Sequence, residues 1–131
     1  MEDNKKDKTA ITEDYVSLET AKLLKEKGFD VPCQHFYKFD SDEIYRGTVF
    51  TNSQIGDKFY NAPTLQMAMK WLREEHNLFI WVGYNGSKGL PFYYEIRNMQ
   101  DNSVVHIGGI CAGTYELVVE AAIKYCLENL I

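Results

Sequence analysis

The segment formed by residues 114–129 constrains the fold more than any other part of the chain. Its charged residues recur every four positions: Glu116, Glu120, Lys124 and Glu128. Almost everything between them is apolar, so the segment predicts a helix with a single narrow solvated stripe. Such a helix is buried on most sides. It either packs across a sheet and against another helix of its own chain, or it turns part of its apolar face to a second copy in a homodimer.

Capping residues and hydrophobic periodicity predict the other elements. Ser17 can cap a helix over residues 17–27, and Gly28 followed by Phe29 supplies a left-handed end for it. A second helix is predicted over residues 63–76, because Pro63 suits a first helical turn. Strands are predicted from alternating or apolar runs over residues 34–39, 43–51, 78–83, 91–97 and 104–107. Residues 52–61 carry only loop signals.

The order of these elements favours an α+β fold with a mainly antiparallel sheet of four or five strands and three helices packed on one face. The strand at residues 78–83 is apolar on both faces, with Phe79 and Trp81 on one of them and Ile80 on the other. A strand that is apolar on both faces is typical of a central position in the sheet. We therefore expect this strand to lie in the middle.

Length and charge limit the classes of partner. The 131 residues carry a formal net charge of −5, which argues against nucleic acid, because phosphate binding needs clustered Lys and Arg. Residues 1–14 are polar and aperiodic, so we expect a disordered or weakly ordered tail before a single domain over residues 15–131. No apolar run approaches the roughly 20 residues of a membrane helix. Three Cys without a disulfide-like spacing favour free thiols and a cytoplasmic location.

The glycine-rich run at residues 108–113 joins a predicted strand to the last helix. Free backbone amides at such a turn can hold an anion or lower the pKa of a thiol. Gly108, Gly109 and Gly113 are therefore candidates for a ligand-binding or nucleotide-binding turn. Residues 109–113 resemble the nucleophile elbow of class I glutamine amidotransferases and DJ-1-like proteins. That resemblance implies Cys111 as a catalytic nucleophile in a small hydrolase-like or amidotransferase-like enzyme.

The histidines do not follow the order of that family. The amidotransferases place their catalytic His after the Cys, whereas His35, His76 and His106 all precede Cys111 here. The alternative is a structural connection with a small buried thiol at Cys111. Cys33 and His35 stand two apart, and His106 and Cys111 five apart, but the tight ligand pairs of zinc sites are absent. We expect no metal and no cofactor.

Aromatic residues are concentrated on the predicted strands. With helices on one face of the sheet, rings on the other face could contact a ligand or a partner protein. Trp81 and Tyr93 are the candidate rings, and Arg97 is expected on the face of Tyr93 together with Glu95. The alternative is that these rings simply form the core and its rim.

A wider resemblance covers most of residues 15–131. It is carried by residues 15–29 (YVSLETAKLLKEKGF), 62–74 (APTLQMAMKWLRE) and 120–131 (EAAIKYCLENLI). The chain resembles a family of small proteins from gut Bacteroides-type bacteria and their phages, which implies a phage or mobile-element context but no activity or catalytic residue. We expect a non-enzymatic accessory or interaction protein that binds a protein or a small ligand.

Overall fold

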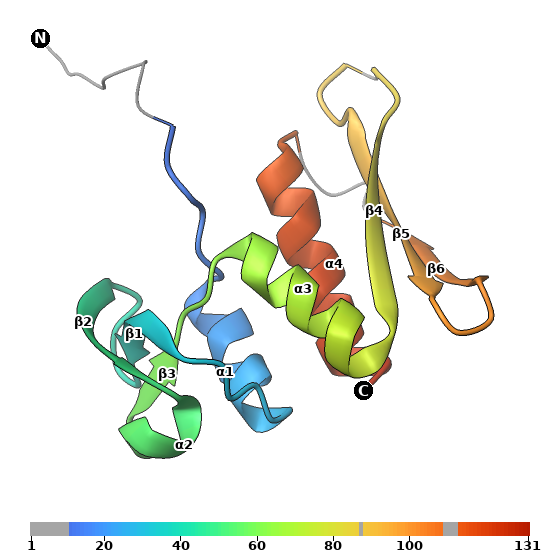
Figure 1. Ribbon diagram of the computed structural model, residues 1–131. Coiled ribbons are helices and arrows are strands. Elements are labelled where there is room, and N and C mark those ends of the chain that lie inside the picture. The colour runs from blue at the N-terminus through green and yellow to red at the C-terminus, as the bar shows by residue number, and fades with distance from the viewer. Residues whose placement is uncertain (1–10, 87, 109–112) are drawn as a thin grey trace, which may run out of the picture.

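A computed structural model of the chain describes residues 11–86, 88–108 and 113–131. Three helices form a middle layer between two small antiparallel sheets (Figure 1). The predicted α+β class and antiparallel strand pairing are confirmed. The strands divide into two sheets of three, however, instead of forming one sheet of four or five. The helices are consequently covered by sheet on two sides.

The helices begin and end close to the predicted positions. In chain order the elements are α1 (Leu18–Glu26), β1 (Cys33–Lys38), β2 (Ile44–Phe50), α2 (Asn52–Ile55), β3 (Phe59–Asn61), α3 (Leu65–His76), β4 (Leu78–Tyr84), β5 (Phe92–Asn98), β6 (Ser103–Gly108) and α4 (Tyr115–Asn129). The Ser17 side chain caps α1 by accepting from the Thr20 amide. Gly28 has a φ of 92°, and the Phe29 amide donates to the Leu24 carbonyl, so the predicted helix end is present.

The first sheet has the strand order β2-β1-β3. Its strands β1 and β2 were predicted over residues 34–39 and 43–51, whereas the short helix α2 and strand β3 fall in residues 52–61, which the sequence indicated as loop. A capping box starts α2, because Thr51 and Gln54 exchange side-chain to backbone hydrogen bonds. A four-residue helix and a three-residue strand are too short to produce a periodic signal.

The second sheet has the strand order β4-β5-β6, so β4 lies at an edge and the prediction of a central position for it is wrong. One face of this sheet packs on α3 and α4 and buries Leu78, Ile80 and Ile96. The opposite face leaves Phe79 and Trp81 exposed. The residues of β4 on that face are apolar although no described element covers them, so the sequence pattern of β4 resembles that of a strand buried on both faces.

The last helix, α4, lies in the core. It contacts α1, α3, β4 and β5, and Val119 and Ile123 are fully buried within the chain. The apolar arc is therefore covered by both a sheet and neighbouring helices, as the first alternative for this segment required. The burial of Val119 and Ile123 gives no support to the alternative that this part of α4 meets a second copy, because neither side chain reaches the surface.

The predicted N-terminal tail falls mostly on residues 1–10, which lie outside the described residues. Residues 11–14 are exposed and have no regular structure. The chain joins the fold at Tyr15, which forms an isolated bridge with Thr64. The Val16 amide then donates to the Pro63 carbonyl, so the entry of α1 and the entry of α3 are tied together.

Candidate functional site

The exposed side of the second sheet brings together the aromatic residues that the sequence singled out. We call this side the open face and define it by seven residues: Phe79, Trp81, Tyr93, Glu95, Arg97, Val104 and Ile107. The register places Trp81 opposite Glu95 and Glu95 opposite Ile107, so these three form one cross-strand row. Phe79, Arg97 and Val104 form the next row. Trp81 is 45% exposed and Ile107 is 60% exposed.

Tyr93 lies flat along the open face because its neighbour across the strands is a glycine. A Cβ atom added to Gly83 would stand only 2.3 Å from Cζ of Tyr93, so the ring occupies the space where a side chain would be. The same ring meets Trp81 edge-on, with 5.7 Å between centroids and 72° between planes. Gly83 thus allows the two rings to form one continuous aromatic surface.

A fixed ion pair borders these rings. The Arg97 Nε donates to Oε2 of Glu95 at 2.5 Å, and Nη1 lies 3.4 Å from both the carbonyl and the side-chain oxygen of Asn102. The Glu95 side chain is mostly buried, so the pair is held more firmly than a typical surface ion pair. Within the described part of the chain, Nη2 of Arg97 has no partner. It remains able to donate to an acceptor on a bound molecule.

The two edge strands beside the open face lack the acidic and strongly basic side chains that often protect the edge of a sheet. The sequences of β4 (LFIWVGY) and β6 (SVVHIG) contain no Asp, Glu, Lys or Arg. Among the described residues, no backbone hydrogen bond connects the outer edge of either strand to another element. Proteins usually protect such edges with charges, Pro or bulges. A bulge opposite Ile96 and Arg97 interrupts the pairing of β6, whereas β4 pairs regularly along its full length.

The glycine-rich turn can be assessed only at its two ends, because Gly109 and Cys111 lie outside the described residues. A Cβ at Gly108 would stand 2.8 Å from the Tyr94 hydroxyl, and a Cβ at Gly113 would stand 3.1 Å from the Gly89 carbonyl. Close packing therefore accounts for both glycines without a ligand. The first turn of α4 is also capped from within, since the Thr114 side chain accepts from the Leu117 amide. A role of Cys111 as nucleophile stays a prediction.

The three histidines lie in different parts of the fold, and the two described cysteines are buried. Each His packs on an aromatic ring in a different part of the fold: His35 on Tyr15, His76 on Trp71 and His106 on Tyr125. Cys33 and Cys126 are buried free thiols, and burial raises the pKa of Cys33 to about 11 and that of Cys126 to about 12. Among the described residues, no three His, Cys, Asp or Glu side chains are grouped so as to hold a metal ion.

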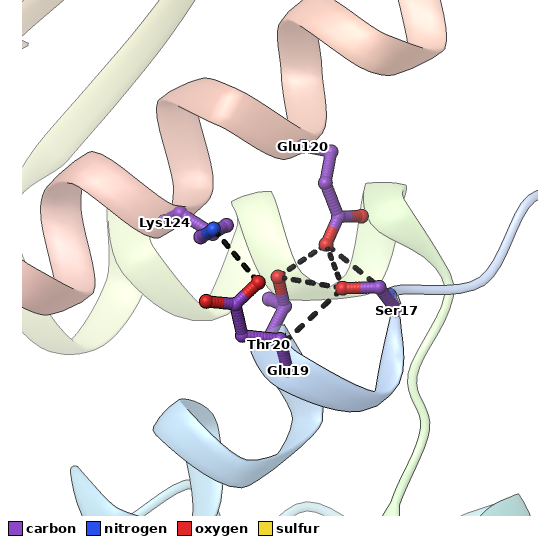
Figure 2. Close-up of polar contacts among 5 residues, drawn as sticks. All are labelled: Ser17, Glu19, Thr20, Glu120 and Lys124. Carbon is purple, nitrogen blue, oxygen red and sulfur yellow. Dashed lines mark hydrogen bonds and ion pairs between the residues drawn. The ribbon is translucent and has the colours of Figure 1, made fainter. Parts of the chain in front are cut away.

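A polar contact between α1 and α4 was not predicted from the sequence (Figure 2). The Glu120 carboxylate accepts hydrogen bonds from the Ser17 amide at 3.2 Å, the Ser17 hydroxyl at 2.7 Å and the Thr20 hydroxyl. One helical turn further on, Lys124 pairs with Glu19 at 2.9 Å. These contacts hold the two helices together, so we assign them a structural role. In the sequence, Glu120 and Lys124 were simply part of the solvated stripe.

The fold and its open face define an α+β domain with an aromatic sheet surface that no part of the described chain covers. Comparison of the chain with protein-family models, with curated proteins and with solved structures finds no match. No described helix is both long enough and apolar enough to cross a membrane. The functional conclusion therefore rests on the geometry of the chain itself.

Proposed function

We propose that this chain is a non-catalytic binding protein that docks a protein partner on the open face. The observation that carries the proposal is the exposure of Trp81, Phe79 and Ile107 on one side of a sheet, around the Arg97–Glu95 pair. Isolated apolar residues at a surface need no explanation, but a contiguous group of rings and aliphatic side chains marks an interaction site. Trp, Tyr and Arg are also the residue types that dominate binding energy at protein interfaces.

The shape and charge of the open face favour a protein over other partners. Small molecules usually need a concave site, whereas the open face is one side of a three-stranded sheet. Nucleic acid would need several basic groups, and here the single Arg97 is already paired with Glu95 in a chain of net charge −5. The edges of β4 and β6, which lack Asp, Glu, Lys and Arg, add backbone groups to which an extended segment of a partner could bind.

The resemblance of the sequence to phage and Bacteroides proteins leads us to place the protein in a phage or mobile-element context. A cytoplasmic location is supported by the two buried free thiols, Cys33 and Cys126. In that setting the partner is either another protein of the same cell or a second copy of this chain. For a second copy we also propose the open face, since Val119 and Ile123 of α4 are buried and cannot take part in the contact.

The test is capture of partner proteins from the native host by the immobilised chain, with the wild type and three variants compared side by side. Trp81→Ala and Ile107→Ser each remove an anchor from the open face and are expected to abolish specific capture. Leu117→Ser is the matched control, because Leu117 on α4 is 58% exposed, close to the 60% of Ile107, but lies away from the open face. Capture by the Trp81→Ala protein at wild-type level would contradict the proposal.

Light scattering decides between a second copy and another protein as the partner. A dimer through the open face should be detected at high micromolar concentration and should revert to a monomer in Trp81→Ala. A monomer at all concentrations, with a partner captured as above, assigns the open face to a different protein.

A further inference from the structure

The first sheet carries a separate concave site on the side of the molecule away from the open face. Its cleft has a volume of about 350 Å³ and lies between the outer face of the sheet and the short helix α2. The apolar walls are formed by Phe36, Phe50, Ile55 and Phe59. In size and lining the cleft falls within the range of small-molecule sites, roughly 300–1,000 Å³ and mainly apolar.

The cleft exists because β2 has a glycine where a side chain would otherwise fill it. A Cβ added to Gly47 would stand 3.1 Å from Cε1 of Phe36, so any larger group there would project over the ring. The Phe36 ring in turn meets Phe59 almost perpendicularly, at 80° with 5.7 Å between centroids. A planar molecule can therefore stack on one of these rings while meeting the edge of the other.

Two buried asparagines hold the wall of the cleft in place. The Asn52 side chain donates to the Phe29 carbonyl and accepts from the Asn61 amide, both at 2.9 Å. The Asn61 side chain donates to the Phe50 carbonyl at 2.6 Å. Of the three buried polar side chains in the described chain, two serve this corner. A buried polar group adds little net stability when it is satisfied, but it fixes one arrangement of the backbone.

Contacts at the surface reinforce the same corner. Asp30 accepts from the Ser53 amide at 2.8 Å and from the Ser53 hydroxyl at 2.9 Å, which ties the first turn of α2 to the end of the α1–β1 connection. Lys25 of α1 donates to the Phe59 carbonyl at 2.8 Å. The cleft is thus formed before any ligand arrives, and preorganisation of this kind lowers the cost of binding.

We propose that this cleft binds a small, uncharged, planar aromatic molecule of about two fused rings. An engineered cavity of about 150 Å³ holds one benzene, so the cleft of about 350 Å³ has room for roughly two rings. No charged residue is among the described residues that line it, so a charged ligand would lose hydration without gaining a partner. Thr48 and Gln54 are among the lining residues, and the Thr48 hydroxyl and the Gln54 amide nitrogen have no hydrogen-bond partner among the described residues, so either group is available to bind one polar atom of the ligand.

The test uses 5-fluoroindole as the probe and follows its fluorine NMR signal during titration with the full chain. We expect saturable binding with a dissociation constant of about 1 mM or tighter, as befits a ligand of this size. Gly47→Leu places a side chain in the cleft and should weaken binding at least about tenfold. Val49→Leu is the matched control on the same strand, because Val49 is exposed but does not line the cleft.

A second measurement keeps the proposal testable if Gly47→Leu does not fold. Intermolecular NOEs in the wild-type complex should connect the probe to ring protons of Phe36 and Phe59. NOEs only to Trp81 or Phe79, no saturable binding, or equal binding by a folded Gly47→Leu protein would each overturn the proposal. Because the cleft and the open face share no residues, failure here leaves the proposed docking of a partner protein unaffected.

Discussion

Removing the Glu120 carboxylate should destabilise the fold, because this group makes the main polar contact between α1 and α4. In Figure 2 one oxygen of this side chain accepts from the Ser17 amide, the Ser17 hydroxyl and the Thr20 hydroxyl. The carboxylate therefore acts as a cap on α1 that is supplied by another helix, and its negative charge also lies at the positive end of the α1 dipole. The Glu120→Ala variant removes all of these interactions at once.

The magnitude follows from how exposed each contact is. A hydrogen bond to a charged group contributes about 1.5–3 kcal/mol when buried, but the two contacts to Ser17 are exposed and contribute much less. Thr20 is fully buried, so its hydroxyl depends on the carboxylate. We expect Glu120→Ala to lower the free energy of unfolding by about 2 kcal/mol, and Glu120→Gln by about half of that.

Urea denaturation followed by circular dichroism measures this change. With a slope of about 2 kcal/mol per molar urea, the midpoint should fall by about 1 M for Glu120→Ala. Glu128→Ala, two turns along the same exposed stripe of α4, is the control and should stay within about 0.5 kcal/mol of the wild type. A double-mutant cycle with Thr20→Val should give a coupling of about 1 kcal/mol. A coupling near zero would refute the inter-helix cap.

Three further outcomes are expected. Val119→Asp buries a charge in the centre of the core and should cost more than about 4 kcal/mol, so thermal melts should lose their cooperative transition instead of revealing a folded monomer. Tyr37→Phe leaves the buried Val16 carbonyl without its 2.6 Å donor and should cost about 1–3 kcal/mol in urea denaturation. Burial raises the pKa of the Cys126 thiol from 9.0 to about 12, so its contribution to stability is complete below pH 9 and is lost as the pH rises toward 12. At pH 10 the free energy of unfolding should be lower by about 1.4 kcal/mol from this thiol alone. Urea denaturation should show this decrease in the wild type and not in Cys126→Ala.

Local chemistry was sufficient to predict the three long helices α1, α3 and α4, but not the four-residue helix α2. Ser17 and Gly28 bracket α1 as expected, and Asn77 adopts the left-handed conformation that ends α3. These signals act within one turn of the chain, so no knowledge of the tertiary fold is needed to interpret them. The α+β class followed from the order of the elements for the same reason.

The division into two sheets was not predictable from local patterns. It depends on which strands pair, and β3 is only three residues long. The position of β4 was misjudged because exposed rings and buried rings give the same pattern in a sequence. The edge position of β4 becomes evident only when β5 is seen to pair with both of its neighbours.

Of the two candidate sites, the open face was partly predictable from local sequence patterns, whereas the cleft was not. Tyr93 and Arg97 share one face, as strand alternation predicted, and the register between β4 and β5 brings Trp81 to the same face. The cleft was missed, since it depends on the missing side chain of Gly47 and on Asn52 and Asn61, whose partners are distant in sequence. The one sequence signal for the cleft was the pair of asparagines, Asn52 and Asn61, at the two ends of the segment interpreted as a loop.

The shared helical layer makes the whole fold a single cooperative unit. On one side α4 supports β4 and β5, and on the other it supports α1, which in turn contacts β3 (Figure 1). A three-stranded sheet is barely stable without a packed face. Both sheets pack on the same helices, so the loss of either sheet weakens the helical layer that supports the other one. Amide exchange should therefore give the same free energy of opening, that of global unfolding, for β1 and β5, although these strands lie at opposite ends of the molecule.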